Sequence, residues 1–442
     1  MKKYLGLLLL QYFRLLARYQ LSRWRPTIIG ITGSAGKTST MEAIAAVLAD
    51  IRWVKTSEKA NSESGIPLNI LGLYPKSYSN SDWLRLALIA PLALLRPSDP
   101  ADTYVVELGI DGPTPPKNMS YLLSIVQPEI GVFTAVNTIH GQHFESWLQA
   151  HDQVPNRTAV LTAIAQEKGK LITTLPSTGT AILNADEPLI AHLANKTNAR
   201  VLTFGTSEAA TVQVLATSHE DGRVFHFKAG ETQCSLHFHQ YLLPPHFGLT
   251  FAAALCVGLR YGQTLEEACT ALQANFVLPP GRATIIAGKH DTTIFDSSYN
   301  SSPEPLIDCF ELLRTMVGGR KLALLGDMRE LGSASASEHE RIGAVAVAVC
   351  DAVFLVGPAM AASLLPLFEK AKKPAFVCSS AADAANKLAA YLRPKDVLLV
   401  KGSQNTLLLE IAIEHLMAHP EQAEAILCRR GQFWEGERKK LL

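Results

Sequence analysis

The sequence predicts an α/β protein with a central domain built on a mostly parallel sheet and a smaller, Rossmann-like C-terminal domain. From residue 27 onward, short apolar runs of strand length alternate with helical patterns, which is typical of parallel sheets covered by helices. A Pro-Pro-Gly sequence at residues 279–281 separates two such series. The 442 residues are enough for two or three domains.

The central series begins with an apolar run that ends in a glycine-rich segment. Buried strands are predicted at Thr27–Thr32, Tyr104–Leu108, Ile130–Ala135 and Ala181–Leu183. Helices are predicted at Met41–Leu48, Phe251–Tyr261 and Leu265–Asn275. The short alternating segments of Val201–Tyr241 predict a hairpin-rich insert.

The C-terminal series follows the Pro-Pro-Gly sequence. Strands separated by helical segments are predicted at Thr292–Asp296, Lys321–Leu325, Ala352–Val356 and Val397–Val400. We therefore expect three parts along the chain, namely a helix over 1–25, a central domain over 26–279 and a C-terminal domain over 280–442.

Charge and cysteine content exclude several classes of protein. The 41 Lys and Arg residues balance 40 Asp and Glu residues, so neither a nucleic-acid-binding polycation nor an acidic disordered chain is expected. No apolar run reaches 18 residues, which argues against an ordinary transmembrane helix. None of the seven cysteines forms a CxxC pair, which favours buried thiols in a reducing compartment, the cytoplasm, over disulfides or a zinc site.

Residues 1–25 predict a helix with a wide apolar face and a narrow polar stripe. The stripe consists of Gln11, Arg14, Arg18 and Ser22, which recur at intervals of three and four residues. Such a helix either lies peripherally on the inner face of a membrane or docks on the protein's own core, and the sequence favours neither. A second apolar block, residues 84–95, is too short to span a bilayer and is a further candidate for membrane contact.

The strongest local motif is the glycine-rich loop Gly-Ile-Thr-Gly-Ser-Ala-Gly-Lys-Thr-Ser over residues 30–39. It joins a predicted strand to a predicted helix, where inward-facing N–H groups and the positive helix end hold phosphates. Lys37 is expected to neutralise the β- and γ-phosphates, and the Thr38 hydroxyl to ligate Mg²⁺. The loop residues expected to bind a nucleotide are Gly33, Ser34, Ala35, Gly36, Lys37, Thr38 and Ser39.

Further motifs follow the loop in a fixed order. They are Lys55-Thr56-Ser57 with Gly65-Ile66-Pro67-Leu68, Glu107-Leu108-Gly109, the run Phe295 to Pro303, Leu325-Gly326-Asp327-Met328-Arg329-Glu330-Leu331-Gly332 with His339, and Lys401-Gly402-Ser403 with Glu410. Together with the loop, they resemble the Mur ligases, ATP-dependent amide-forming enzymes of peptidoglycan precursor synthesis, and most of all the MurF type. The resemblance runs from Thr27 to the end of the chain.

This resemblance implies roles for individual residues. Glu107, at the end of a predicted strand, is expected to bind Mg²⁺ together with Thr38. Nucleotide contacts are implied for Asn184, Arg282, Asp296, Tyr299 and Asn300.

The family's second metal site needs a lysine that is carbamylated and a histidine. Lys168 fits the lysine, because it precedes Asn184-Ala185-Asp186 at the family's usual separation, whereas an arginine such as Arg157 cannot carry a carbamate. A solvated helix lysine is the alternative for Lys168. His140 and His143 both follow Asn137, and His140 is preferred. The expected catalytic residues are Lys37, Lys168 and His140, and the expected metal ligands are Thr38, Glu107, Lys168 and His140.

The implied reaction is formation of an amide bond through an acyl phosphate. ATP and two Mg²⁺ ions are the expected cofactors, and the partners are small molecules, a carboxylate-bearing muramoyl-peptide precursor and an amine such as D-alanyl-D-alanine. No nucleic acid is expected as a partner.

One departure from the family affects the substrate. MurF-type ligases carry an N-terminal domain for the UDP-sugar before the ATP loop, and this sequence reaches the loop at Gly30 without one. A related ligase acting on a lipid-linked or non-muramoyl acceptor is therefore the alternative. The Leu325–Gly332 motif disfavours a folylpolyglutamate or cyanophycin synthetase relative, and Lys168 with Glu107 disfavours a nucleotide-dependent membrane-surface regulator.

Overall fold

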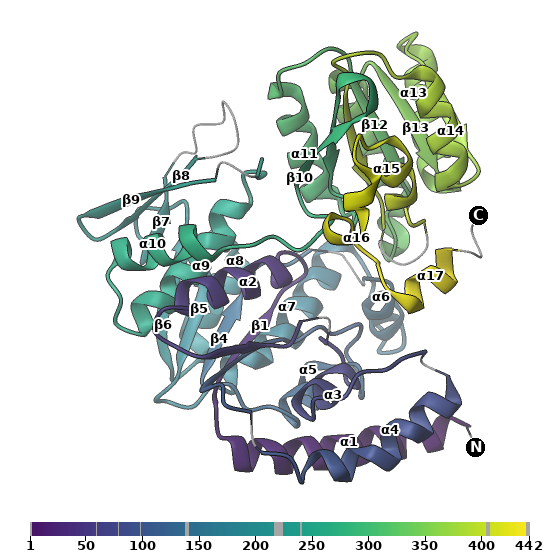
Figure 1. Ribbon diagram of the computed structural model, residues 1–442. Coiled ribbons are helices and arrows are strands. Elements are labelled where there is room, and N and C mark those ends of the chain that lie inside the picture. The colour runs from purple at the N-terminus through teal and green to yellow at the C-terminus, as the bar shows by residue number, and fades with distance from the viewer. Residues whose placement is uncertain are drawn as a thin grey trace. The chain divides into compact units, whose positions relative to one another are not determined.

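Two sheets organise the chain, and each belongs to one of two compact units that we describe separately (Figure 1). The computed structural model describes residues 2–58, 60–77, 79–97, 99–137, 141–215, 224–238, 241–403 and 407–438. The first unit comprises Met1–Ala216, His226–Leu236 and Gly248–Val277. The second comprises Thr217–Phe225, His237–Phe247 and Leu278–Leu442.

The sheet of the first unit has the strand order β2-β3-β1-β4-β5-β6-β7-β8-β9. Its strands are β1 (Thr27–Thr32), β2 (Val54–Thr56), β3 (Thr103–Glu107), β4 (Ile130–Phe133), β5 (Thr180–Asn184), β6 (Arg200–Gly205), β7 (Val212–Val214), β8 (Val224–Ala229) and β9 (Thr232–His237). The pairs from β2 to β7 are parallel, and β8 pairs antiparallel with β7. The four predicted strands are confirmed, and the expected insert extends the main sheet instead of forming a separate one.

Helices cover this sheet. They are α1 (Lys2–Trp24), α2 (Lys37–Leu48), α3 (Gly65–Ile70), α4 (Asn80–Ala93), α5 (Met119–Leu123), α6 (Gly141–Gln149), α7 (Arg157–Thr173), α8 (Pro188–Ala191), α9 (Phe247–Arg260) and α10 (Leu265–Asn275). Local sequence sets their ends: α10 begins with a capping box, in which the Thr264 hydroxyl accepts from the Glu267 N–H and the Glu267 carboxylate accepts from the Thr264 N–H. The three predicted helices are confirmed.

Strand β1 lies in the middle of the parallel region, between β3 and β4. The register aligns Ile31 with Glu107 on one side and Thr32 with Phe133 on the other. Because the strands are parallel, their carboxyl ends lie at the same edge of the sheet, where α/β proteins bind ligands. The glycine-rich loop follows β1 at this edge.

The sheet of the second unit has the order β10-β11-β15-β12-β13-β14. Its strands are β10 (Thr284–Gly288), β11 (Thr292–Asp296), β12 (Lys321–Gly326), β13 (Ala352–Val356), β14 (Ala375–Cys378) and β15 (Val397–Lys401). Its helices are α11 (Pro303–Thr315), α12 (Ser335–Val349), α13 (Pro358–Lys370), α14 (Ala381–Tyr391), α15 (Glu410–Leu416), α16 (Ala423–Ile426) and α17 (Gln432–Arg438). The four predicted strands are confirmed, and the edge strands β10 and β14 are additional.

Helix α1 packs on the first unit through one face. Phe13 and Ala17 are fully buried, and the Trp24 Nε1–H donates to the Ala101 carbonyl at 2.5 Å. Docking on the protein's own core is therefore confirmed for this face of the helix. Within the described residues, no helix combines the length and the apolar character needed to cross a bilayer.

The expectation that no cysteine is disulfide-bonded is wrong for one pair. Cys234 of β9 and Cys269 of α10 form a disulfide, with their Cα atoms 6.8 Å apart. The pairing joins elements separated by 35 residues, and this proximity comes from the tertiary fold rather than from a local spacing. The other five cysteines are free and buried, as expected.

Candidate active site

The loop between β1 and α2 is shaped by two glycines. Gly33 has a φ of +151°, and a Cβ at this position would lie 2.0 Å from the Thr134 hydroxyl oxygen. Gly36, directly before α2, has a φ of +78°. Both conformations favour glycine, and the first also leaves no room for a side chain. The loop leads directly into the N-terminal end of α2, and the positive end of a helix is where a phosphate would be stabilised.

The loop is held in place by the neighbouring strand ends. The Ser34 N–H donates to the Ala135 carbonyl at 2.8 Å, and the Thr134 hydroxyl donates to the Ala35 carbonyl at 2.7 Å. Asn184, at the end of β5, donates from Nδ2 to the Thr134 carbonyl at 2.8 Å. Asn184 is thus close to the loop through Thr134, a residue that the sequence did not single out. Its direct contact with nucleotide remains a prediction.

Two lysines converge on a single carbonyl of the loop. The Lys37 ammonium donates to the Gly33 carbonyl at 2.8 Å, and the Lys168 Nζ of α7 lies 3.3 Å from the same oxygen. These two residues are 131 positions apart in the sequence. The structure therefore brings two of the three predicted catalytic residues together at the phosphate loop.

The surroundings of Lys168 favour its neutral form. Its side chain is among the largest that are fully buried, so the alternative of a solvated helix lysine is wrong. Burial lowers the pKa of Lys168 well below its usual value, and the nearby Lys37 charge lowers this pKa further, while Asp111 acts in the opposite direction. A neutral amine is the form of lysine that can act as a nucleophile.

Glu107 lies at the same sheet edge, at the end of β3 and beside Ile31 of β1. It is 2% exposed, and its N–H donates to the Ser57 hydroxyl at 3.1 Å. Thr38, in the first turn of α2, is half-buried, and Ser39 beside it is buried. An oxygen donor set of one carboxylate and one hydroxyl suits Mg²⁺, which usually binds one or two carboxylates together with phosphate oxygens and water.

His140 and His143 are the two candidate histidines of the predicted metal site. His140 lies outside the described residues, and His143 is exposed on α6. Among the described residues, no group of three or more His, Cys, Asp or Glu side chains is arranged to hold a metal ion.

The second unit contains the other predicted nucleotide residues. Asp296 ends β11 and is fully buried, with one carboxylate oxygen accepting from the Ser298 N–H at 2.9 Å. Burial raises its pKa, while the Ser298 hydrogen bonds and the Arg429 and Lys401 charges lower it. The buried Lys401, at the end of the adjacent strand β15, donates to the Ser297 hydroxyl at 3.1 Å and the Asn300 carbonyl at 2.9 Å.

Two arginines, Arg282 and Arg429, stack on the aromatic ring of Tyr299. The Arg282 guanidinium carbon lies 4.5 Å from the centre of the Tyr299 ring, and that of Arg429 lies 5.2 Å from it. The Tyr299 N–H donates to the Gly281 carbonyl at 3.1 Å. Arg282, Asp296, Tyr299 and Asn300 thus form one cluster at the strand ends of the second unit, which supports a shared role.

Arg429 was missed in the sequence, although it forms the most buried ion pair of this cluster. It donates to Glu410 at 2.9 Å, and the side chains of the two residues are 2% and 0% exposed. No motif precedes Arg429, and its position in a Cys-Arg-Arg sequence near the chain end carries no periodic signal. Thr134 was also missed, because a hydroxyl residue at the end of an apolar run is too common in sequences to indicate a functional site.

We expect Arg429→Met to destabilise the second unit by about 3–5 kcal/mol, because it leaves the Glu410 carboxylate buried without its cation. Burial already raises the Glu410 pKa, and Arg429 opposes this shift. Arg314→Met is the control: it removes an exposed pair with Glu311 and is expected to cost less than about 1 kcal/mol. Calorimetric unfolding measures both, and equal losses in the two variants would contradict the prediction.

The Leu325–Gly332 motif is also fixed by buried hydrogen bonds. The fully buried His339 accepts from the Met328 N–H at Nε2 (3.0 Å), so its Nδ1 carries the proton and lies 2.8 Å from the Ser335 carbonyl. Asp327 accepts from the Met360 N–H at 2.7 Å, at the start of α13. His339 therefore positions the loop after β12 by hydrogen bonding.

Two family models match the chain. The Mur ligase middle domain matches residues 31–241, and the glutamate ligase domain of Mur ligases matches residues 281–404. These ranges contain the phosphate loop, Lys168 and the Asp296 cluster.

Individual relatives carry a common name. The UDP-N-acetylmuramoyl-tripeptide–D-alanyl-D-alanine ligase of Mycobacterium tuberculosis (strain CDC 1551 / Oshkosh) is 29% identical over 405 residues, covering 85% of this chain and 70% of the relative. The enzyme of the same name from Synechocystis sp. is 30% identical over 340 residues, covering 76% of this chain and 62% of the relative. The crystal structure of a MurF ligase from Thermotoga maritima in complex with ADP matches with a TM-score of 0.69 at 22% identity, over 98% of this chain and 84% of that chain.

Proposed function

Because the chain belongs to the Mur ligase family, we propose that it is an ATP-dependent ligase of the MurF type. It joins the amine of D-alanyl-D-alanine to a peptide carboxylate of UDP-N-acetylmuramoyl-tripeptide, a step of peptidoglycan synthesis. The observation that carries this proposal is the convergence of Lys37 and Lys168 on the phosphate loop, in a chain whose relatives bear this name.

The reaction has two steps. A substrate carboxylate oxygen attacks the γ-phosphorus of ATP, the bond to ADP breaks, and an acyl phosphate forms. The amine nitrogen then attacks the acyl carbon, phosphate leaves, and the nitrogen loses a proton. Neither step needs a covalent bond to the protein, so the protein acts by placing the reactants and neutralising charge.

The first unit supplies this environment. Lys37 places its positive charge within the loop, next to the N-terminal end of α2, where the transferred phosphoryl group is stabilised. The Thr38 hydroxyl and the Glu107 carboxylate would hold Mg²⁺, which when bound neutralises phosphate oxygens. Burial of Glu107 keeps water away from its carboxylate and strengthens its interactions with cations.

Lys168 is proposed to carry a carbamate and to contribute to a second Mg²⁺ site with His140. Its neutral amine can add to CO₂, forming an N–C bond and releasing one proton. The product keeps one N–H that can donate to the Gly33 carbonyl, and its negative charge next to Lys37 replaces the repulsion between two cations. Gly33 to Ser39, Asn184 and the cluster of Arg282, Asp296, Tyr299 and Asn300 are proposed to bind the nucleotide.

We place the enzyme in the cytoplasm, where ATP and UDP-linked precursors are available. Its partners are these small molecules, and its near-zero net charge gives no basis for nucleic-acid binding.

A coupled assay of ADP release tests the proposal. With UDP-N-acetylmuramoyl-tripeptide and D-alanyl-D-alanine, we expect one ADP per amide formed. Without the tripeptide we expect no ADP, and without the amine at most one ADP per enzyme, because the acyl phosphate then forms but is not consumed. Replacing the amine with L-alanyl-L-alanine is the matched substrate control. Continuous release of ADP over many turnovers in the absence of the amine would indicate a nucleotide-driven regulator and contradict the ligase proposal.

A further inference from the structure

Helices α1 and α4 lie side by side on the first unit (Figure 1). They share a face whose side chains are apolar and exposed. Its residues are between 56% and 81% exposed: Leu8, Leu15 and Tyr19 of α1, Leu84, Leu88 and Leu92 of α4, and Leu95 just beyond it. We call these seven residues the leucine face. On each helix they recur at intervals of four, seven or eight residues and so lie along one side.

The contacts between the helices determine where this face points. The Tyr12 hydroxyl donates to the Ala87 carbonyl at 3.0 Å, and the rings of Phe13 and Trp83 are 6.2 Å apart. The side opposite the leucine face is buried in both helices, at Phe13 and Ala17 in α1 and at Leu86 and Ala90 in α4. Because each helix buries one side and contacts its neighbour through another, the exposed leucines of both helices point away from the core.

This arrangement reverses the usual pattern of a surface helix, whose outward side is polar. Single exposed leucines are ordinary, whereas seven large apolar side chains on two adjacent helices form the kind of patch that marks an interaction site. Burying them in a hydrocarbon environment removes them from water, which is favourable.

The charges around the leucine face are positive. Residues 1–25 contain six Lys and Arg residues and no acid, although the whole chain has a formal net charge of only +1. Arg18, Arg23 and Arg96 are exposed on or beside the two helices. Positive charge flanking an apolar helix face is the pattern of helices that lie in the interface of anionic membranes.

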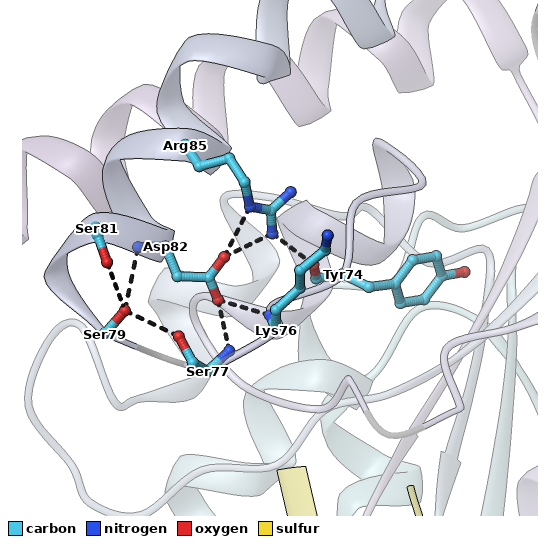
Figure 2. Close-up of polar contacts among 7 residues, drawn as sticks. All are labelled: Tyr74, Lys76, Ser77, Ser79, Ser81, Asp82 and Arg85. Atoms are coloured by element: carbon cyan, nitrogen blue, oxygen red, sulfur yellow. Dashed lines mark hydrogen bonds and ion pairs between the residues drawn. The ribbon is translucent and has the colours of Figure 1, made fainter. Parts of the chain in front are cut away.

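The single acid between residues 74 and 97, Asp82, does not offset these charges at the surface. It is 5% exposed, and its carboxylate accepts from the backbone N–H groups of Lys76 at 2.6 Å and Ser77 at 2.8 Å. The same carboxylate forms an ion pair with Arg85 at 2.6 Å, as Figure 2 shows. Asp82 therefore stabilises the start of α4 and presents no carboxylate to a partner.

We propose that the leucine face docks the protein on the surface of an anionic lipid bilayer, with α1 and α4 lying in the plane of the headgroups. The 23 residues of α1 give a contact roughly 35 Å long, and the arginines next to it can extend their charged ends to lipid phosphates. A second copy of the chain fits less well, because two such faces would bring like charges together. This inference does not depend on the ligase activity.

Sedimentation with lipid vesicles tests the proposal on the full chain. The probes are phosphatidylglycerol-containing vesicles and pure phosphatidylcholine vesicles, each at low and high salt. We expect the protein to bind the anionic vesicles at low salt. Its affinity for neutral vesicles, and for anionic vesicles at high salt, is expected to be at least about tenfold lower, because several basic side chains supply the attraction.

Matched variants separate the leucine face from general surface effects. Leu15→Glu with Leu88→Glu is expected to lower vesicle affinity at least about tenfold. The control, Val154→Glu with Val317→Glu, introduces the same charge at exposed valines elsewhere and is expected to bind like the wild type. ADP release without lipid is expected to be equal in both double variants, which confirms folding.

Three outcomes would overturn the proposal. The first is equal binding by the two double variants, and the second is equal binding of the wild type to anionic and neutral vesicles. The third is a wild-type protein that binds no vesicle and is a dimer in light scattering, with the dimer dissociated by the leucine substitutions. Failure of ADP release in the wild type would contradict the ligase proposal alone, since vesicle binding is measured without substrates.

Discussion

Lys37→Ala is expected to lower the rate of ADP release by about 10²–10³-fold or more, with little change in folding stability. The Lys37 ammonium lies 2.8 Å from the Gly33 carbonyl, inside the loop and at the N-terminal end of α2. A cation placed there acts on charge that develops in the transition state, when the γ-phosphoryl group leaves ADP. Its removal therefore affects the rate constant of the chemical step more than it affects the binding of either substrate.

Two further variants make the Lys37 prediction specific. Lys196→Ala removes an exposed lysine of the same unit and is expected to leave the rate unchanged. Lys37→Arg keeps the positive charge but not the compact ammonium, and we expect it to restore only part of the lost rate. Full activity in Lys37→Ala, with an unfolding midpoint equal to that of the wild type, would exclude the proposed role of the phosphate loop.

Lys168→Met is expected to abolish ligation and, in CO₂-depleted buffer, to increase stability by about 1 kcal/mol. Methionine fills a similar volume, and the Gly33 carbonyl retains its hydrogen bond from Lys37. The variant cannot form a carbamate and no longer buries an amine. Loss of activity together with a gain in stability is the mark of a residue retained for function.

The pH dependence of stability provides a second readout for Lys168. Its pKa in the folded protein lies well below that in the unfolded chain, about 10.4, so between the two values only the unfolded chain binds the proton. In CO₂-depleted buffer, where Lys168 is a free amine, wild-type stability is therefore reduced as the pH falls below about 10, and Lys168→Met removes this contribution. The difference in unfolding free energy between variant and wild type should grow as the pH decreases.

Carbon dioxide distinguishes a carbamate from a merely structural lysine. Wild-type activity should fall in CO₂-depleted buffer and return on addition of bicarbonate, whereas Lys168→Met and Lys168→Arg should not respond. Lys170→Met, two residues away on α7 and half exposed, is the control, because its ammonium pairs with Glu167 rather than with the loop. An active, bicarbonate-independent Lys168→Met enzyme would refute the assignment.

The parts of the fold that depend on local pattern could be predicted from the sequence. Thr27–Thr32 and Ala352–Val356 are buried on both faces, so their continuous apolar runs identify them directly. The edge strand β10 was missed because its exposed residues alternate with buried ones over only five positions. The Cys234–Cys269 bond was missed because it depends on which elements become neighbours in space.

The candidate site was predictable to the extent that its residues lie in motifs. Lys37 follows from the loop and Glu107 from its place at a strand end, whereas the proximity of Lys168 to Gly33 appears only when α7 packs beside β1. Thr134 and Arg429 act through hydrogen bonds to backbone or to a buried acid, which leave no spacing in the sequence. Similarly, the amphipathic pattern of residues 1–25 fits either a membrane surface or the protein's own core. The structure shows that one face of this helix packs on the core.

The most direct test of the central claim follows an oxygen atom. The acyl-phosphate route transfers one oxygen of the tripeptide carboxylate to inorganic phosphate, because that oxygen bonds to phosphorus in the first step and leaves with it in the second. With a heavy-oxygen label in the carboxylate, mass spectrometry should find one labelled oxygen in the phosphate for each amide formed. Unlabelled phosphate, its oxygen derived from water, would show that the protein hydrolyses ATP without activating the substrate.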